Sequence, residues 1–216
     1  MESRVAMGER HPGTNRACWL PICVGMLLVL AQPVLAQERT CSATQVAGEA
    51  NLTHAGARSA VTVGTALAAK DVLQTGSSGR VEVACSDGTR VTLGPDTQIG
   101  LGSLVGEQSD DASIGMSLHR GIARFLAPVR TWGTFNVFGP VAVASVRSTE
   151  WIMDTPKGGT AVFVIAGAVD VLGKRGDNVR LLPTYGIDVA PDGTMAEPKV
   201  WGAKRVADVK SRLGLQ

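Results

Sequence analysis

Few side chains of this 216-residue chain have the types and spacing that enzyme catalysis requires. His54 and His119 can act as bases or metal ligands, but each stands apart from any nucleophile or ligand motif. Glu150 and Asp154 can be drawn as paired carboxylates, although the Thr-Pro step that follows them favours an exposed turn. The pair Asp110-Asp111 lacks a third ligand at calcium-loop spacing. We therefore predict no catalytic residue, no metal site and no cofactor.

Binding to a partner is favoured by the residue types in the segment Arg147-Ser148-Thr149-Glu150-Trp151. Arginine and tryptophan are the residue types that dominate the binding energy of many interfaces. These five residues are therefore the candidate partner contacts. The alternative is that Arg147 and Glu150 form a local ion pair while Trp151 fills the core.

The first 36 residues predict export. Three arginines precede an apolar stretch at 17–30, and the segment ends with Val34 at −3 and Ala36 at −1 of a cleavage position. The apolar stretch is shorter than the roughly 20 residues that a membrane-spanning helix needs. We therefore expect a signal peptide at 1–36 that is cleaved near Ala36, and an uncleaved anchor stays open as the alternative.

The composition of the remaining chain excludes some classes of protein. Without the three arginines and two glutamates of residues 1–36, 18 basic residues face 17 acidic ones, so no nucleic-acid partner is expected. Glycine is abundant and aromatic residues are few, which favours short strands and tight turns. Cys41 and Cys85 remain, and two thiols in an exported chain suggest one disulfide. The alternative is a buried Cys85 thiol with Cys41 near a mobile terminus.

Alternating apolar residues on both sides of Ser86-Asp87-Gly88 predict a β-hairpin. A two-residue loop would place Val83 opposite Thr92, which lies on the wrong face of the sheet. A three-residue loop places Val83 opposite Val91, so the apolar faces agree. The hairpin therefore requires a positive φ at Gly88.

The fold class that these patterns predict is all-β. Short strands, odd-length turns and two similar strand pairs favour a compact β-roll or a short β-solenoid with a short C-terminal helix, and a β-sandwich is the alternative. Further strands are expected at 118–126, 135–137, 141–146, 161–165, 169–171 and 179–181, and a helix at 203–213. The expected organisation is a signal peptide at 1–36, a flexible lead-in at 37–58, a β domain at 59–192 and a tail with the helix at 193–216.

Two blocks of the chain resemble the FecR domain, a periplasmic sensor module of bacterial iron-uptake signalling. The first block runs from Asp71 to Thr97, with Asp71-x-Leu73-x-Thr75-Gly76-x-x-Gly79-Arg80 followed by Asp87-Gly88-Thr89. The second block runs from Leu118 to Val171 and includes Arg147-Ser148-Thr149, where the family usually has Arg-Gly-Thr. The turn positions within the blocks are Gly76, Gly79, Asp87, Gly88, Gly94, Pro95, Gly121 and Gly167.

The resemblance implies a periplasmic binding or signalling module that contacts an envelope protein or a cell-wall component. Full-length family members resemble a cytoplasmic anti-sigma segment joined to this module by one membrane helix. At most sixteen residues precede the apolar stretch here, so direct sigma-factor control is not expected. A structural envelope protein is the alternative, and an envelope hydrolase is the least favoured function. Contact with a membrane is expected only if the signal segment is uncleaved.

Overall fold

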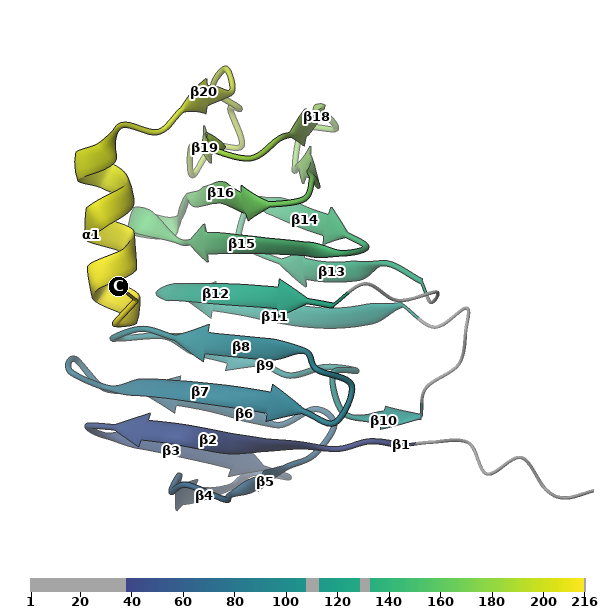
Figure 1. Ribbon diagram of the computed structural model, residues 1–216, viewed down its shortest axis with the longest axis vertical. Coiled ribbons are helices and arrows are strands. Elements are labelled where there is room, and N and C mark those ends of the chain that lie inside the picture. Colours follow the sequence, from purple (N-terminus) through teal and green to yellow (C-terminus); the bar gives the residue numbers. More distant parts are fainter. Residues whose placement is uncertain (1–37, 108–112, 129–132, 216) are drawn as a thin grey trace, which may run out of the picture. The chain divides into compact units, whose positions relative to one another are not determined.

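The computed structural model describes residues 38–107, 113–128 and 133–215, so the expected signal peptide lies outside the described residues. Most of the described residues form two open nine-stranded sheets that face each other (Figure 1). The all-β class and the short C-terminal helix are confirmed. In the described part of the chain, no helix is long and apolar enough to span a membrane.

The nearer sheet in Figure 1 is called the front sheet, and the other is called the back sheet. In spatial order, the front sheet consists of β20 (Lys199–Val200), β19 (Tyr185–Val189), β16 (Thr160–Ala166), β15 (Thr149–Asp154), β12 (Ile122–Ala127), β8 (Arg90–Leu93), β7 (Arg80–Cys85), β2 (Cys41–Ala47) and β5 (Ala66–Leu67). The back sheet consists of β18 (Asn178–Leu181), β17 (Val169–Gly173), β14 (Ala142–Val146), β13 (Phe135–Phe138), β11 (Ile114–Arg120), β9 (Gln98–Gly100), β6 (Val72–Thr75), β3 (Ala50–His54) and β4 (Ala57–Ala60). The short strands β1 (Glu38–Arg39) and β10 (Gly106–Glu107) pair separately.

The chain passes repeatedly from one sheet to the other, as in a roll, while the two sheets pack face to face, as in a sandwich. Neighbouring described strands are antiparallel except for β11 and β13, which are parallel. One apolar core joins the inner faces of both sheets, and it includes Val83 and Val91 of the front sheet and Val137 and Val171 of the back sheet. Apolar side chains at alternate positions of strands such as β6 and β7 build this core.

The hairpin of β7 and β8 has the predicted three-residue loop. Val83 pairs with Val91, and Gly88 has a φ of 87°. Cys41 of β2 pairs directly with Cys85 of β7, and the two residues form a disulfide, as the first of the two alternatives predicts.

Reduction of the Cys41–Cys85 disulfide is expected to lower the free energy of unfolding by about 4 kcal/mol, because the bond closes a loop between residues 44 positions apart. Urea unfolding with and without dithiothreitol measures this difference. The Cys41→Ala/Cys85→Ala chain is the control, since its unfolding midpoint should not respond to the reductant. Equal midpoints for the oxidised and reduced native chain would contradict the prediction.

The expected flexible lead-in at 37–58 is wrong, because most of its described residues form strands of both sheets. β2 pairs with β7 and β3 pairs with β6, and Ala43 and Leu52 lie in the core. The register of β2 shifts between Ala43 and Gln45, and this shift hides the alternation that marks a strand. The β domain therefore begins before residue 59.

The single strand expected at 118–126 is also wrong, because the chain changes sheets at Gly121. That residue has a φ of 90°, and a Cβ placed on it would lie within 2.5 Å of Thr97. The chain can therefore pass from β11 in the back sheet to β12 in the front sheet only with glycine at this position.

The C-terminal helix α1 (Ala203–Leu213) packs on the outer face of the front sheet. Val209 and Leu213 join a second apolar cluster with Ile122, Ile152 and Phe163. The predicted helical face of Val206, Val209 and Leu213 therefore meets the protein.

Two ion pairs fasten α1 to the front sheet. Arg212 donates hydrogen bonds of 2.6 and 3.1 Å to Asp154. Arg205 donates two hydrogen bonds to Asp188, and these hold the pKa of Asp188 below its ordinary value. The Arg205 guanidinium also lies 3.5 Å from the centre of the Trp201 ring.

Candidate functional site

A groove of about 500 Å³ lies around the turn between β14 and β15, at the end of the strands that faces right in Figure 1. The groove brings together three of the five predicted partner contacts, Arg147, Ser148 and Thr149. Asp170 of β17 and Arg180 of β18 also line it. The side chains around the groove thus supply both charges and several hydroxyl groups.

Arg147 is the exposed cation of this turn, and among the described residues its guanidinium has no hydrogen bond or ion pair. Thr149 has a structural role, because its buried hydroxyl donates a hydrogen bond of 2.9 Å to the Ala168 carbonyl. Ser148 is half-buried, and its backbone does not adopt a positive φ. Ser148 is therefore accommodated in this turn without backbone strain.

Glu150 and Trp151 do not line the groove, and the burial of Trp151 contradicts its expected role as a contact. Trp151 is fully buried, and its ring stacks on Phe125 with ring centres 5.0 Å apart. Glu150 forms an ion pair of 2.8 Å with Arg124 of the neighbouring strand β12, and not with Arg147. The alternative that placed Trp151 in the core is therefore confirmed. The ion pair between Arg147 and Glu150 that the same alternative expected does not form, since Glu150 pairs with Arg124.

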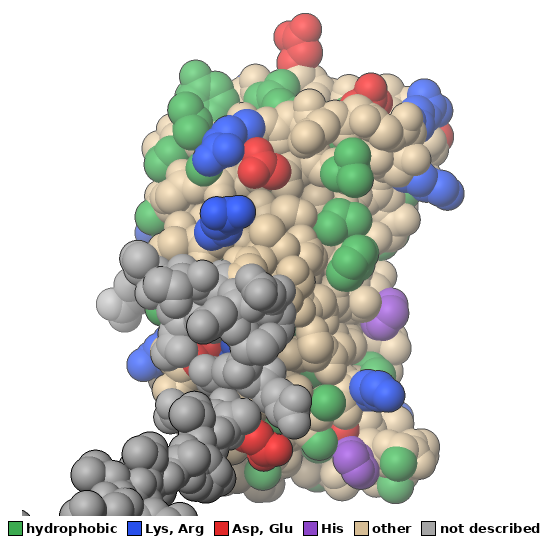
Figure 2. Space-filling view, turned by 90° about the vertical axis from the view of Figure 1, so that its right-hand side faces the viewer, with side chains coloured by type: hydrophobic (Ala, Val, Ile, Leu, Met, Phe, Trp, Pro, Cys, Tyr) green, Lys and Arg blue, Asp and Glu red, His purple; other side chains and the backbone are tan. Residues whose placement is uncertain are grey.

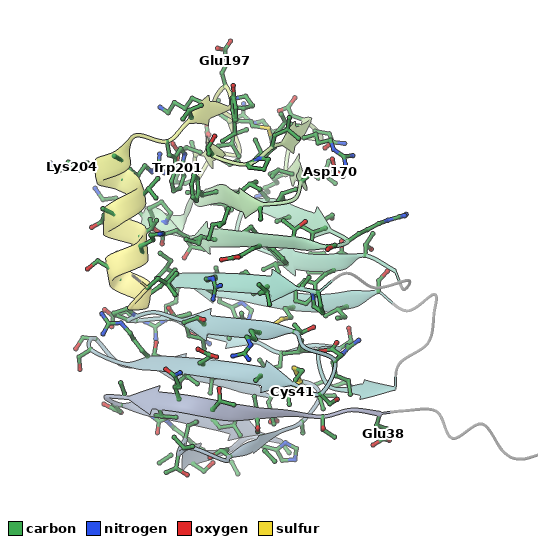
Figure 3. The ribbon with its side chains drawn as sticks, in the orientation of Figure 1. Glu38, Cys41, Asp170, Glu197, Trp201 and Lys204 are labelled. Carbon is green, nitrogen blue, oxygen red and sulfur yellow. A yellow bond between two sulfur atoms is a disulfide. The ribbon has the colours of Figure 1, made fainter. Side chains whose placement is uncertain are left out.

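Four polar residues form a row across the outer face of the back sheet, and three of them, Ser145, Asp170 and Arg180, line the groove. Asn136 of β13 pairs with Ser145 of β14, Ser145 pairs with Asp170, and Asp170 pairs with Arg180. The Ser145 hydroxyl donates a hydrogen bond of 2.7 Å to Asn136 Oδ1, and the Asp170 and Arg180 side chains lie 3.7 Å apart. Strands lie about 4.8 Å apart, so the four residues span about 14 Å. We call these residues the polar row, and Figure 3 labels its Asp170.

An apolar row runs parallel to the polar row, two residues away along each strand. Phe138 pairs with Val143, and Val143 pairs with Leu172. The side chains of Phe138 and Leu172 are 47% and 48% exposed. Figure 2 views this end of the strands and shows hydrophobic side chains in a column on its right. The outer face of the back sheet therefore offers an apolar strip beside a polar one.

The residues that were weighed as catalytic groups do not form a common site. His54 forms a contact of 2.6 Å with Asp71, and His119 is exposed on β11. Glu150 and Asp154 are held by different arginines, Arg124 and Arg212. Among the described residues, no three His, Cys, Asp or Glu side chains form a cluster that can hold a metal ion.

Asp170, Arg180 and Phe138 were not identified from the sequence as site residues. The alternation of apolar residues in the strands expected at 169–171 and 179–181 places Asp170 and Arg180 on the outer face. Their position beside Ser145 follows from the order of strands in the back sheet, which no local pattern encodes.

Comparisons with known proteins agree with the fold. The family model described as FecR protein matches residues 71–170. Two crystal structures of a "putative anti-sigma factor" from Parabacteroides distasonis ATCC 8503, at 2.50 and 1.65 Å resolution, have 22% and 24% sequence identity and TM-scores of 0.53. Each match covers 63% of this chain and 62% of the other, so the chain spans less than two thirds of these neighbours. At this identity the likeness shows the fold alone. A search of curated proteins found no match.

Proposed function

From the match of the FecR family model to residues 71–170, we propose that this chain is a non-catalytic binding module of the bacterial cell envelope. The module captures another envelope component in the groove at the β14–β15 turn. Capture by the groove is the event that a sensor module would pass on as a signal.

One observation carries this proposal. Arg147 is exposed in a groove of about 500 Å³, and its guanidinium makes no hydrogen bond or ion pair with the described residues. Arginine is enriched among the residues that dominate binding energies, since its planar group donates several hydrogen bonds at once. The Cys41–Cys85 disulfide also fits an exported protein, because disulfides persist in oxidising compartments.

Capture from an envelope extract tests the proposal. The purified chain is immobilised and compared with its Arg147→Ala variant, which we expect to retain about tenfold less of the captured component. The thermal midpoint should not change, because Arg147 is exposed.

Arg58→Ala is the matched control, since Arg58 is an exposed arginine on β4, outside the groove. This variant should retain the captured component in full. Equal recovery by the native chain and the Arg147→Ala variant would reject the groove as the binding site.

A further inference from the structure

The chemistry of the groove and of the two rows restricts the class of ligand, and the inference below rests on the proposed function. The polar row and Arg147 offer hydrogen-bond donors from Arg147 and Arg180 and acceptors from Asp170. A hydroxyl group both donates and accepts, so a ligand rich in hydroxyls can satisfy both kinds of group.

The groove carries charges of both signs, with Arg147 and Arg180 as the cations and Asp170 as the anion. Asp170 lies in the groove and already pairs with Arg180 at 3.7 Å, so an acidic group bound there would meet a like charge. A neutral ligand avoids that repulsion and can still accept a hydrogen bond from Arg147.

The apolar row offers a hydroxyl-rich ligand an apolar contact surface. The Phe138 ring packs over Gly115 of the neighbouring strand β11, since a Cβ placed on Gly115 would lie 3.6 Å from Phe138 Cε2. The strand has no side chain at Gly115, and the ring covers that position while staying 47% exposed. A sugar ring has an apolar face of C–H groups and an edge of hydroxyls, and it therefore matches an apolar row beside a polar one.

We propose that the outer face of the back sheet binds a neutral glycan chain that crosses β13, β14, β17 and β18. Its hydroxyls bond to the polar row and to Arg147, and its C–H faces rest on Phe138 and Leu172. The envelope component that the module captures is thus a polysaccharide.

Titration calorimetry with two neutral hexasaccharides, chitohexaose and maltohexaose, tests this proposal on the full chain. We expect one of them to bind, and we expect Phe138→Ala and Asp170→Asn each to weaken that binding about tenfold. Both residues lie on the exposed face, so circular dichroism and the thermal midpoint should stay unchanged.

The controls are Val63→Ala and Glu197→Gln, which change an exposed apolar and an exposed acidic residue outside the two rows. Neither control should alter the affinity. Between 50 and 300 mM NaCl the affinity should change by less than about twofold, because a neutral ligand releases no counterions.

Three results would overturn the proposal. They are the absence of binding to both hexasaccharides, binding that Phe138→Ala leaves intact, and preferential binding of heparin or a poly-glutamate peptide with a steep salt dependence. Arg147-dependent capture from the extract without hexasaccharide binding would reject the glycan and keep the proposed function. Phe138-dependent hexasaccharide binding without Arg147-dependent capture would reject the proposed function as stated.

Discussion

Replacing Trp151 with alanine is expected to lower the free energy of unfolding by about 3–5 kcal/mol, the usual cost of truncating a buried tryptophan. The Trp151 side chain is fully buried and lies against Phe125 and Phe135, with ring centres 5.0 and 5.4 Å away. Truncation would leave a cavity between the two sheets. Urea unfolding followed by circular dichroism measures the loss.

Trp151→Phe is the control for this experiment. The Trp151 indole nitrogen finds no hydrogen-bond acceptor among the described residues, so phenylalanine loses volume but no hydrogen bond. We therefore expect a smaller loss, of about 1–2 kcal/mol. A Trp151→Ala protein of native stability that no longer captures its partner would show that the residue is a contact and not part of the core.

Replacing Asp87 with alanine is the second change with a large expected effect, a loss of about 3–5 kcal/mol in the free energy of unfolding. The side chains of Arg39 and Asp87 are 4% and 0% exposed, and Arg39 Nε lies 2.5 Å from Asp87 Oδ2. Asp87 Oδ1 also accepts a hydrogen bond of 2.7 Å from the Thr89 amide. The substitution leaves the buried Arg39 charge without this carboxylate, and thermal or urea unfolding measures the cost.

Asp170→Ala gives the matched comparison, because it removes an acidic partner from an exposed ion pair. The Asp170 and Arg180 side chains are 50% and 68% exposed, and such pairs contribute about 0–1 kcal/mol. If Asp87→Ala costs no more than Asp170→Ala, the pair of Arg39 and Asp87 does not stabilise the fold.

The Asp-Gly turn of the hairpin therefore has two roles, and only one was predictable from the sequence. Alternation on both sides of the turn determined the register and the positive φ of Gly88. The burial of Asp87 against Arg39 depends on β1, which lies 48 positions earlier in the chain and has no strand pattern of its own. Local periodicity cannot predict a contact between residues that lie so far apart in the sequence.

The segment 147–151 likewise has features that local sequence predicts and features that depend on distant parts of the chain. An arginine and a tryptophan within five residues favour a binding surface, but this pattern does not say which of the two side chains the core takes. Arg147 lies in the turn before β15, whereas Trp151 lies within β15 and points into the core. Only the position of the core shows which of the two residues is buried. Glu150 forms its ion pair with Arg124 because β12 is the neighbour of β15 in the sheet.

Local patterns in the sequence are enough to predict a β protein with the Ser86-Asp87-Gly88 hairpin and a C-terminal helix, because period-2 alternation, turn parity and helical spacing are local properties. The order of the strands, and with it the pairing of Cys41 with Cys85, depends on the three-dimensional fold. That order aligned Asn136, Ser145, Asp170 and Arg180 into one row and placed Arg147 in the same groove as three of them. Strand order follows from long-range packing of the two sheets, so the candidate binding face, unlike the strands that build it, was not predictable from local sequence.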